Sequence, residues 1–534
     1  MQLVAYGAQD IYLTGNPQIT FFKVVYRRHT NFSMESIKQA FDGTADLGGS
    51  AVSTISRNGD LISRIYIESD GKFDHEGDDT GGGDNVPVLR ERYGDSLIKV
   101  CSLEIGGQEI DKHNALWNRV YSDLTEFNPS GHFGGNLTGG SEPKEITGNG
   151  TLRQLMSGVG LCTHANESNN NVLFAHGPDG TESVVNGIEY SDAGTGHIIK
   201  SKIIIPLNFW FCRNPGLALP LIALQYHEVK LHFEFEHENK LLCSTIDGVV
   251  NGNIGTIDKY IKHSNHFVNI SLWVDYIYLD TDERRRFAQV SHEYLIEQVQ
   301  YKKETLNTPN AAIDLYFNHP IKELIWCSKS VGVKGRNNTT GNIASVTGGR
   351  NDPTAGEVSL DKMEGKWTLK LNGHERFQPR DTKYFTRTQV WQHHTGYGAL
   401  PTISIIKQNF ENADTGTAGT RDTNKNIFRG QTDATDDPNL LKSQYAEGVG
   451  TDSIAVYSFA LNPEEHQPSG TCNFSRIDSA ELIGTNLKIA EMGVSGHTPS
   501  ALSGQEFKME LNIYAVNYNV LRIMSGMGGL AYSN

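Results

Sequence analysis

Six carboxylates in a glycine-rich stretch are the densest group of residues that could do chemistry. They are Asp70, Asp74, Glu76, Asp78, Asp79 and Asp84. Carboxylate oxygens are the ligands that a calcium ion prefers. The stretch lacks the D-x-D-x-D-G spacing and the terminal glutamate of an EF-hand loop. A solvated loop is therefore the favoured interpretation, and calcium binding is the alternative.

Three histidines form a second candidate group: His374 and the adjacent pair His393 and His394. Imidazole nitrogens are common zinc ligands, and helical metal sites space them as H-x-x-x-H or H-E-x-x-H. Neither spacing occurs here, and adjacent residues on a strand point to opposite faces. A metal would require the fold to bring His374 to the pair, so the sequence predicts no metal site.

Motifs of common enzymes do not occur in the chain. It has no G-x-S-x-G elbow, no phosphate-binding P-loop and no G-x-G-x-x-G between a strand and a helix. The cysteines form no C-x-x-C pair, which indicates reduced thiols rather than disulfides or a zinc site. They are Cys101, Cys162, Cys212, Cys243, Cys327 and Cys472. We therefore expect no catalytic residues, no cofactor and no metal, in a protein that is not an enzyme.

The charge of the chain limits its partners. A net charge of −15 argues against a protein that coats nucleic acid, because such proteins carry a basic surface that neutralises phosphates. For the basic triplet 284–286, a solvated linker between domains is the favoured interpretation and a basic patch the alternative. No signal peptide opens the chain, and its longest apolar stretches, such as 217–224, are too short to span a bilayer. We expect a soluble protein that is made in the cytosol.

Short sequence matches indicate an internal repeat, and a repeat decides the fold before any site does. Residues 103–109 (LEIGGQE) match 369–375 (LKLNGHE), residues 211–215 (FCRNP) match 459–463 (FALNP), and residues 275–279 (DYIYL) match 517–521 (NYNVL). The matches keep their order, and the distance between partners shrinks along the chain because the first copy has longer loops. Two similar domains are predicted, with Gly107 and Gly373 in equivalent turns.

Each half is rich in strand patterns. In residues 229–236 (VKLHFEFE) apolar and polar side chains alternate, which is typical of a strand with one buried and one wet face. Similar alternation occurs at 97–105, 272–279, 454–461 and 509–516. Residues 113–124 are predicted to form a helix, because Leu116, Val120 and Leu124 recur on one stripe.

Other local signals complete the outline of each half. The pairs Asn214-Pro215 and Asn462-Pro463 suggest helix starts, with asparagine as N-cap and proline at the first helical position. Insertions rich in Gly, Asn and Thr are expected to be polar loops on one face, at roughly 128–200, 331–357 and 411–452. Many strands, few short helices and long loops suit tandem β-sandwiches, with jelly rolls the favoured form.

Three long phrases of the chain closely resemble the major capsid proteins of the nucleocytoplasmic large DNA viruses. They are LVAYGAQDIYLTGNPQITFFKVVYRRHTNF from Leu3, PLNFWFCRNPGLALPLIALQYHEV from Pro206 and NYNVLRIMSGMGGLAYSN from Asn517. The resemblance runs from Leu3 to Asn534 and is broken only by the variable loops. Chlorella-virus and marseillevirus-like members look most similar.

The resemblance implies an all-β fold of tandem, or double, jelly-roll β-sandwiches with a few short helices. Together with the repeat, it divides the chain into an N-terminal arm (1–28), a first jelly roll (29–282), a linker (283–290) and a second jelly roll (291–534). The last of these includes a C-terminal arm from Met524. Both arms are expected to be extended and to make contacts outside their own barrel.

The function that the resemblance implies is structural. Homotrimers with two barrels per chain would form pseudo-hexagonal capsomers that tile the icosahedral capsid of a large DNA virus. The implied partners are further copies of the chain, minor capsid proteins and penton proteins. An internal membrane would lie nearby, and the shell would not contact nucleic acid directly. Synthesis and assembly would take place in the cytoplasm of the infected host cell, and the product would belong to the virion.

Two other classes of function stay open on the sequence alone. A carbohydrate-binding tandem β-sandwich protein would explain the fold and the aromatic loops, but not the long matching termini. A hydrolase built on tandem jelly rolls would need a pair of carboxylates or a metal cluster in one barrel, and none stands out. Size in solution separates these classes, because only the shell protein requires a trimer.

Overall fold

The structure is a computed structural model of the 534-residue chain. The described residues are 14, 16–18, 20–24, 26–76, 85–89, 93–126, 131–137, 144–150, 156, 183–185, 188–192, 196–246, 249–250, 253–254, 265–329, 358, 360–361, 363–396, 398, 452–489 and 509–532.

The first half of the chain folds into two antiparallel sheets. One contains, in spatial order, β1 (Phe32–Gln39), β18 (Asn265–Leu279), β4 (Leu61–Glu76), β12 (Gly196–Pro206), β11 (Ile188–Asp192) and β10 (Ser183–Val185), with β13 (Leu219–Pro220) beside β4. The other contains β2 (Asp42–Gly43), β3 (Ser50–Thr54), β14 (Val229–Phe235), β6 (Ile98–Ile105) and β7 (Gln108–Asn114). Small two-stranded sheets join β5 (Asn85–Leu89) to β15 (Leu242–Ile246), β16 (Val249–Val250) to β17 (Asn253–Ile254), and β8 (Gly131–Leu137) to β9 (Lys144–Gly150).

The second half also folds into two antiparallel sheets. One contains β19 (His292–Leu306), β29 (Met509–Met524), β21 (Pro320–Lys329) and β22 (Leu360–Asp361); β26 (Ile454–Ser458) and β27 (Cys472–Asn473) also pair with β21, and β30 (Met527–Leu530) with β29. The other contains β20 (Ala311–Asp314), β28 (Ala480–Ile489), β23 (Met363–Leu371) and β24 (His374–Glu375), with β25 (Arg380–Asp381) also on β23.

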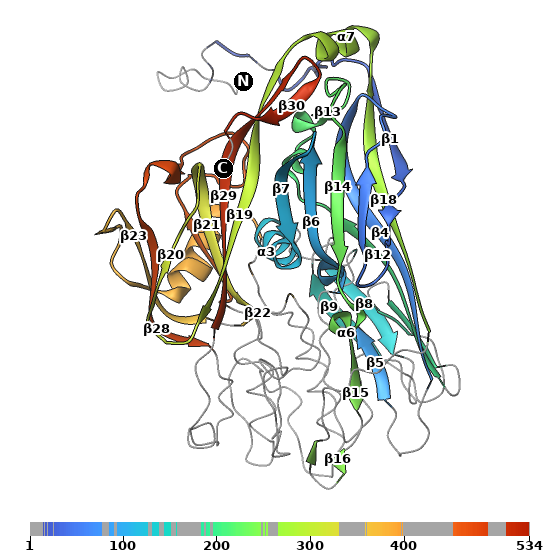
Figure 1. Cartoon of the computed structure of the whole chain (residues 1–534), viewed down its shortest axis with the longest axis vertical. Coiled ribbons are helices and arrows are strands. Elements are labelled where there is room, and N and C mark those ends of the chain that lie inside the picture. The colour runs from blue at the N-terminus through green and yellow to red at the C-terminus, as the bar shows by residue number, and fades with distance from the viewer. Residues whose placement is uncertain are drawn as a thin grey trace, which may run out of the picture.

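Short helices lie between the strands. They are α2 (Tyr93–Leu97), α3 (Ala115–Thr125), α5 (Trp210–Arg213), α6 (Glu238–Leu241), α7 (Thr281–Gln289) and α8 (Gln389–His393), the 3-10 turns η1 (Pro215–Leu217) and η7 (Phe474–Arg476), and the π-helical segment η3 (Tyr384–Thr388). Among the described helices, none is long and apolar enough to cross a membrane. The two halves stand side by side, with α7 joining them at one end and α3 between them (Figure 1).

The strand order is the same in both halves. Each half has eight main strands, which in chain order are β1, β3, β4, β6, β7, β12, β14 and β18 in the first half and β19, β20, β21, β23, β24, β26, β28 and β29 in the second. In one sheet of each half, the strands lie in the order first, eighth, third, sixth: β1-β18-β4-β12 and β19-β29-β21-β26. The other sheet reads second, seventh, fourth, fifth: β3-β14-β6-β7 and β20-β28-β23-β24. Two interleaved antiparallel sheets in this order form a jelly roll. The predicted all-β fold with two tandem jelly rolls is confirmed.

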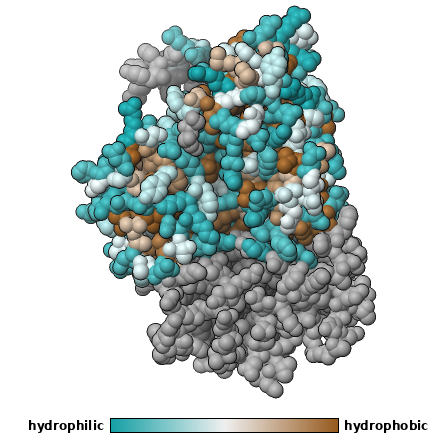
Figure 2. All heavy atoms as spheres, in the orientation of Figure 1, coloured by the Kyte–Doolittle hydropathy of each residue, from teal (hydrophilic) through white to brown (hydrophobic). Residues whose placement is uncertain are grey.

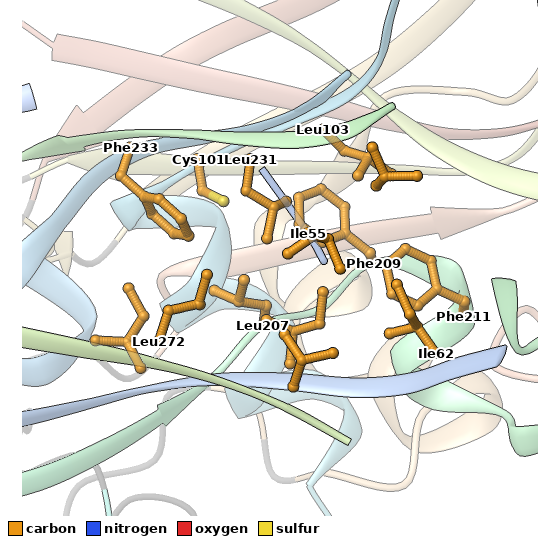
Figure 3. Close-up of a cluster of buried hydrophobic side chains, with 14 of the residues drawn as sticks. Ile55, Ile62, Cys101, Leu103, Leu207, Phe209, Phe211, Leu231, Phe233 and Leu272 are labelled. Carbon is orange, nitrogen blue, oxygen red and sulfur yellow. The ribbon is translucent and has the colours of Figure 1, made fainter. Parts of the chain in front are cut away.

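Each pair of sheets encloses an apolar core. The alternation predicted for β14 is confirmed, since Val229, Leu231, Phe233 and Phe235 are buried and contribute to the core of the first half. Figure 3 shows Phe233 and Leu231 pointing across this core toward Leu272 of β18. The second half has its own core around Trp326 and Trp367, whose rings meet edge to face with centroids 5.7 Å apart.

The turns at Gly107 and Gly373 are equivalent, as predicted. Gly106-Gly107 joins the fourth strand to the fifth in the first half, and Asn372-Gly373 does so in the second. All four residues have positive φ, from 51° to 87°. Two-residue turns of this kind match the twist of an antiparallel hairpin and favour Gly and Asn.

A one-residue β-bulge is also repeated. In the first half Ser63 of β4 is skipped, because Asp275 pairs with Arg64 and Tyr276 with Ile62. In the second half Lys322 of β21 is skipped in the same way, opposite Val516 and Asn517 of β29. Each bulge lies on the third strand opposite the eighth, so it fixes how the two halves correspond residue by residue. It aligns Asp275 with Val516, which corrects by one residue the sequence match of 275 with 517.

Several local predictions are wrong in instructive ways. Segment 128–200 contains β8–β11 and part of β12 rather than loop alone. Asn214 caps η1, but Asn462-Pro463 starts a turn rather than a helix, and Glu464 there accepts hydrogen bonds from Thr395 in the loop after α8. The C-terminal segment from Met524 is a hairpin, β29–β30, rather than an extended arm. Most of segments 331–357 and 411–452 lies outside the described residues, as do residues 1–13.

Candidate assembly surfaces

The two groups of residues that could have bound a metal are not assembled into a site. Asp70, Asp74 and Glu76 belong to strand β4 rather than to a loop, and the other three acidic residues lie outside the described part of the chain. His374 lies exposed on β24, whereas the pair 393–394 ends helix α8 rather than lying on a strand. Among the described residues, no group of three or more His, Cys, Asp or Glu side chains could hold a metal ion.

The described cysteines are free, as the sequence indicated: Cys101, Cys212, Cys327 and Cys472. Cys101 and Cys327 are buried in apolar surroundings. Burial raises the pKa of Cys212 and of Cys327 to about 12, which keeps both thiols protonated and unreactive. The side chains of Cys162 and Cys243 lie outside the described residues.

Helix α3 forms the apolar part of the junction between the halves. The predicted helix at 113–124 is confirmed, with Leu116, Val120 and Leu124 buried. It belongs to the first half, yet these side chains cluster with Ile325, Val456 and Tyr514 from the second half. The Trp117 and Tyr514 rings lie 5.1 Å apart, and the Tyr514 hydroxyl is 3.0 Å from Asn114 Oδ1. The outward face of the β29 sheet is therefore covered by a helix from the neighbouring barrel.

Charged side chains complete the junction beside this apolar cluster. Glu297 of β19 accepts a hydrogen bond from Arg213 of the first half at 2.7 Å, and its other oxygen lies 2.7 Å from Lys322 Nζ. Burial alone would raise the pKa of Glu297, but the polar contact with His466, whose Nδ1 lies 3.7 Å away, and the positive charges of Lys322 and Arg213 lower it to about 2. Glu297 is therefore ionised at neutral pH and ties the two barrels together.

His394 sits in a second buried ionic group. Its ring nitrogens lie 3.0 Å from Glu323 and 3.0 Å from Glu464. Burial alone would lower the pKa of His394, but the two carboxylates raise it to about 9, so the ring is charged at neutral pH. The residues after it return to the first half, where Gly396 N donates to Leu124 O at 2.7 Å. His394 therefore fixes a loop that closes the end of α3, which is a structural role.

The C-terminal hairpin contacts the other barrel, as predicted for this segment. Gly528 of β30 packs against Leu224 and Ile105 of the first half. Its carbonyl oxygen is 2.9 Å from His227 Nδ1, and Tyr226 N donates to Gly526 O at 2.9 Å. The C-terminal hairpin thus braces the junction near the end of the molecule that carries α7 (Figure 1).

Exposed apolar side chains gather at the end of the molecule that carries α7. Phe32 pairs with Leu279 just before α7, and Figure 1 places the described part of the N-terminal segment at the same end. The exposed residues there are Phe21, Phe22, Val24, Tyr26, Phe32, Tyr226, Val290, Met524 and Met527. The face drawn in Figure 2 is mostly hydrophilic at this end as elsewhere, with apolar residues scattered over both barrels. The group, called the α7-end patch below, is a candidate contact surface.

The triplet 284–286 lies on α7. All three arginines are exposed, and Arg284 Nε is 2.9 Å from Asp60 Oδ1. Asp280 caps the helix through the backbone N–H of Thr281. The favoured interpretation as a solvated connection agrees with this exposure, although the segment is helical rather than irregular.

Two family models match nearly the whole chain. The model described as "Major capsid protein N-terminus" matches residues 20–280, and "Large eukaryotic DNA virus major capsid protein" matches residues 283–407 and 443–529. The chain belongs to this family of major capsid proteins. Its role is therefore structural, as a component of the virion capsid, and not enzymatic.

Individual capsid proteins agree with this family. The major capsid protein of Pyramimonas orientalis virus is 41% identical over 100% of this chain and 99% of its own, and that of Paramecium bursaria Chlorella virus 1 is 35% identical over the same shares. A chain of the quasi-atomic model of the PBCV-1 virus capsid has a TM-score of 0.60 and 32% identity, over 96% of this chain and 100% of its own. The Faustovirus major capsid protein, at 12% identity and a TM-score of 0.54, shares the fold.

Proposed function

We propose that this capsid protein forms homotrimers, in which six barrels surround one axis and make a pseudo-hexagonal capsomer of an icosahedral shell. The observation that carries the proposal is the pair of barrels with one strand order. Three copies of two similar barrels approximate six-fold symmetry while the chains close a three-fold ring. No catalytic residue, cofactor or metal is needed for this role.

The proposed division of the chain keeps each barrel intact. The arm is 1–28, the first barrel 29–282, the linker 283–290 and the second barrel 291–534. In support, the first pair of sheets begins with β1 and ends with β18, whereas the second pair begins with β19. Helix α7 spans most of the linker, and Asp280 caps its start, so the connection between the barrels has regular structure.

The α7-end patch supports a second part of the proposal, that this end faces the interior of the particle. Apolar side chains such as Phe22, 99% exposed, favour a protein or lipid partner over water. The partners proposed there are minor capsid and penton proteins, near an internal membrane and away from nucleic acid. Synthesis and assembly are proposed to occur in the cytoplasm of the host cell.

Light scattering on the purified protein tests the trimer. We expect three times the 59.0 kDa of one chain, and the same mass at high salt, because salt screens exposed charges but not apolar burial. A stable single chain at all concentrations would contradict the proposal.

Deletion of residues 2–25 tests the inward-facing end. The shortened protein is expected to remain trimeric, because both cores begin after residue 31, and to fail in shell assembly with the minor proteins. Assembly at the normal yield would contradict the assignment of this end.

A further inference from the structure

The two barrels carry equivalent outward faces: one is covered by a helix of the same chain, and among the described residues no helix lies on the other. In the second barrel, Tyr514 and Ile325 of this face are buried under α3 of the first barrel. The repeated bulge aligns Tyr514 with Trp273 of the first barrel. Tyr514 lies two residues before Val516, which precedes the bulge in the second barrel, and Trp273 lies two residues before Asp275, which precedes it in the first. Around Trp273, the partners in register are Tyr66 and Lys38.

The face of the first barrel around Trp273 is accessible. Lys38 is exposed, and Tyr66 and Trp273 are half-buried. In the second barrel, Tyr514 pairs in register with Tyr301 on one side and Ile325 on the other. In the first barrel, Trp273 pairs in the same way with Lys38 and Tyr66. A partly exposed, partly aromatic sheet face thus lies at the position where its equivalent carries a helix.

The second barrel has a helix equivalent to α3. Helix α3 follows β7, the fifth strand of the first barrel, and begins at Asn114, which accepts a hydrogen bond from Trp117 N at 2.8 Å. The segments η3 and α8 follow β24, the fifth strand of the second barrel, after the short strand β25, and neither has a side-chain cap. In the second barrel, Phe385 of η3 is buried in the barrel's own core, and Val390 of α8 is buried in the apolar cluster of the junction.

The outer side of this second helix is unusual for its exposed apolar surface. Trp391 is 80% exposed. Leu461, whose carbonyl oxygen is 3.0 Å from His393 Nδ1, is 75% exposed. A tryptophan exposed to this degree at the rim of a barrel is the type of residue that dominates binding energy when it is buried by a partner.

We infer that α8 of one chain packs on the first barrel of a second copy, with Trp391 against the face formed by Lys38, Tyr66 and Trp273. This contact would repeat, between chains, the contact that α3 makes within the chain. Every junction in the ring would then have the same form, in which the helix of one barrel covers the outward face of the next. Between chains this is a heterologous interface, and the ring closes after three chains. The inference rests on the proposed trimer and names the surfaces that build it. A lysine ammonium and two aromatic rings also suit an indole, through cation–π and ring contacts.

Substitution of Trp391 by alanine tests the inference. Because the side chain is exposed, W391A is not expected to lower the melting temperature of the folded chain. It is expected to weaken the association of chains into trimers at least tenfold, measured by sedimentation. Tyr316, 78% exposed on the connection between β20 and β21, provides the matched control: Y316A should stay trimeric.

A cross-link tests the same contact without removing the tryptophan. Chains carrying Lys38→Cys and chains carrying Gln392→Cys are mixed and treated with a short bis-maleimide. Covalent dimers are expected from the mixture and not from either variant alone. A trimeric W391A together with no cross-link would overturn the inference and leave the trimer standing. A wild-type protein that is monomeric throughout would overturn the proposed function itself.

Discussion

At the scale of single residues, the junction depends on charges that are held out of water. Lys322, 1% exposed, has Glu297 as its counterion. Removing one partner of a buried pair leaves the other charge uncompensated, which costs far more than the pair itself contributes. The substitution Glu297→Gln is therefore expected to lower the free energy of unfolding by about 3–5 kcal/mol.

Urea denaturation measures this effect against a matched surface pair. Glu293 and Arg522 lie 2.8 Å apart, but their side chains are 59% and 50% exposed. Glu293→Gln is therefore expected to change stability by less than about 1 kcal/mol. Equal losses for the two variants would show that Glu297 is not the anchor described.

His394 predicts a dependence on pH. Its pKa is raised from 6.5 to about 9 in the folded chain, so its stabilising effect is complete below pH 6.5 and is lost as the pH rises through 9. The loss is at most about 3 kcal/mol on the scale that links pKa to free energy. His394→Gln should abolish the difference in stability between pH 6.5 and 9.5 that the wild type shows. A variant with the wild-type pH profile would contradict the charged state assigned to this ring.

At the scale of elements, the paired hairpin turns make the repeat measurable. A side chain added at Gly107 or Gly373 would meet no atom within 4 Å, so only the backbone conformation opposes it. Gly107→Ala and Gly373→Ala are each expected to cost about 1–2 kcal/mol, because both residues have positive φ. The corresponding asparagine variants should cost less, since Asn tolerates this conformation. Thermal unfolding of the four variants is the measurement, and very unequal alanine costs would contradict the equivalence.

Elements that a barrel builds from its own neighbours could be predicted from sequence. Strand β14 and helix α3 follow their apolar periodicities because each has one face in a nearby core. Strand β29 does not: residues 509–516 were predicted to have a wet face, yet both faces are buried. The covering helix comes from the other half of the chain, at a sequence distance that periodicity cannot report. The continuous apolar run at 513–516 was the available signal.

The ionic groups of the junction could not be predicted for the same reason. Glu297 and Arg213 belong to different barrels, and nothing in their local sequence marks them as partners. His394 was considered as a metal ligand, but its neighbours are the carboxylates of Glu323 and Glu464, which arrive from two other segments. Ion pairs between distant segments follow only from tertiary structure, whereas enzyme motifs are local and their absence could be established from the sequence.

At the scale of the whole molecule, we propose that one chain supplies two of six similar barrels around an axis. Electron microscopy of the purified protein tests this most directly. Averaged views along the axis should show six lobes with three-fold symmetry and a hexagonal outline, each pair of lobes having the size of the two barrels in Figure 1. Isolated particles with two lobes, or rings with a different number of lobes, would contradict it.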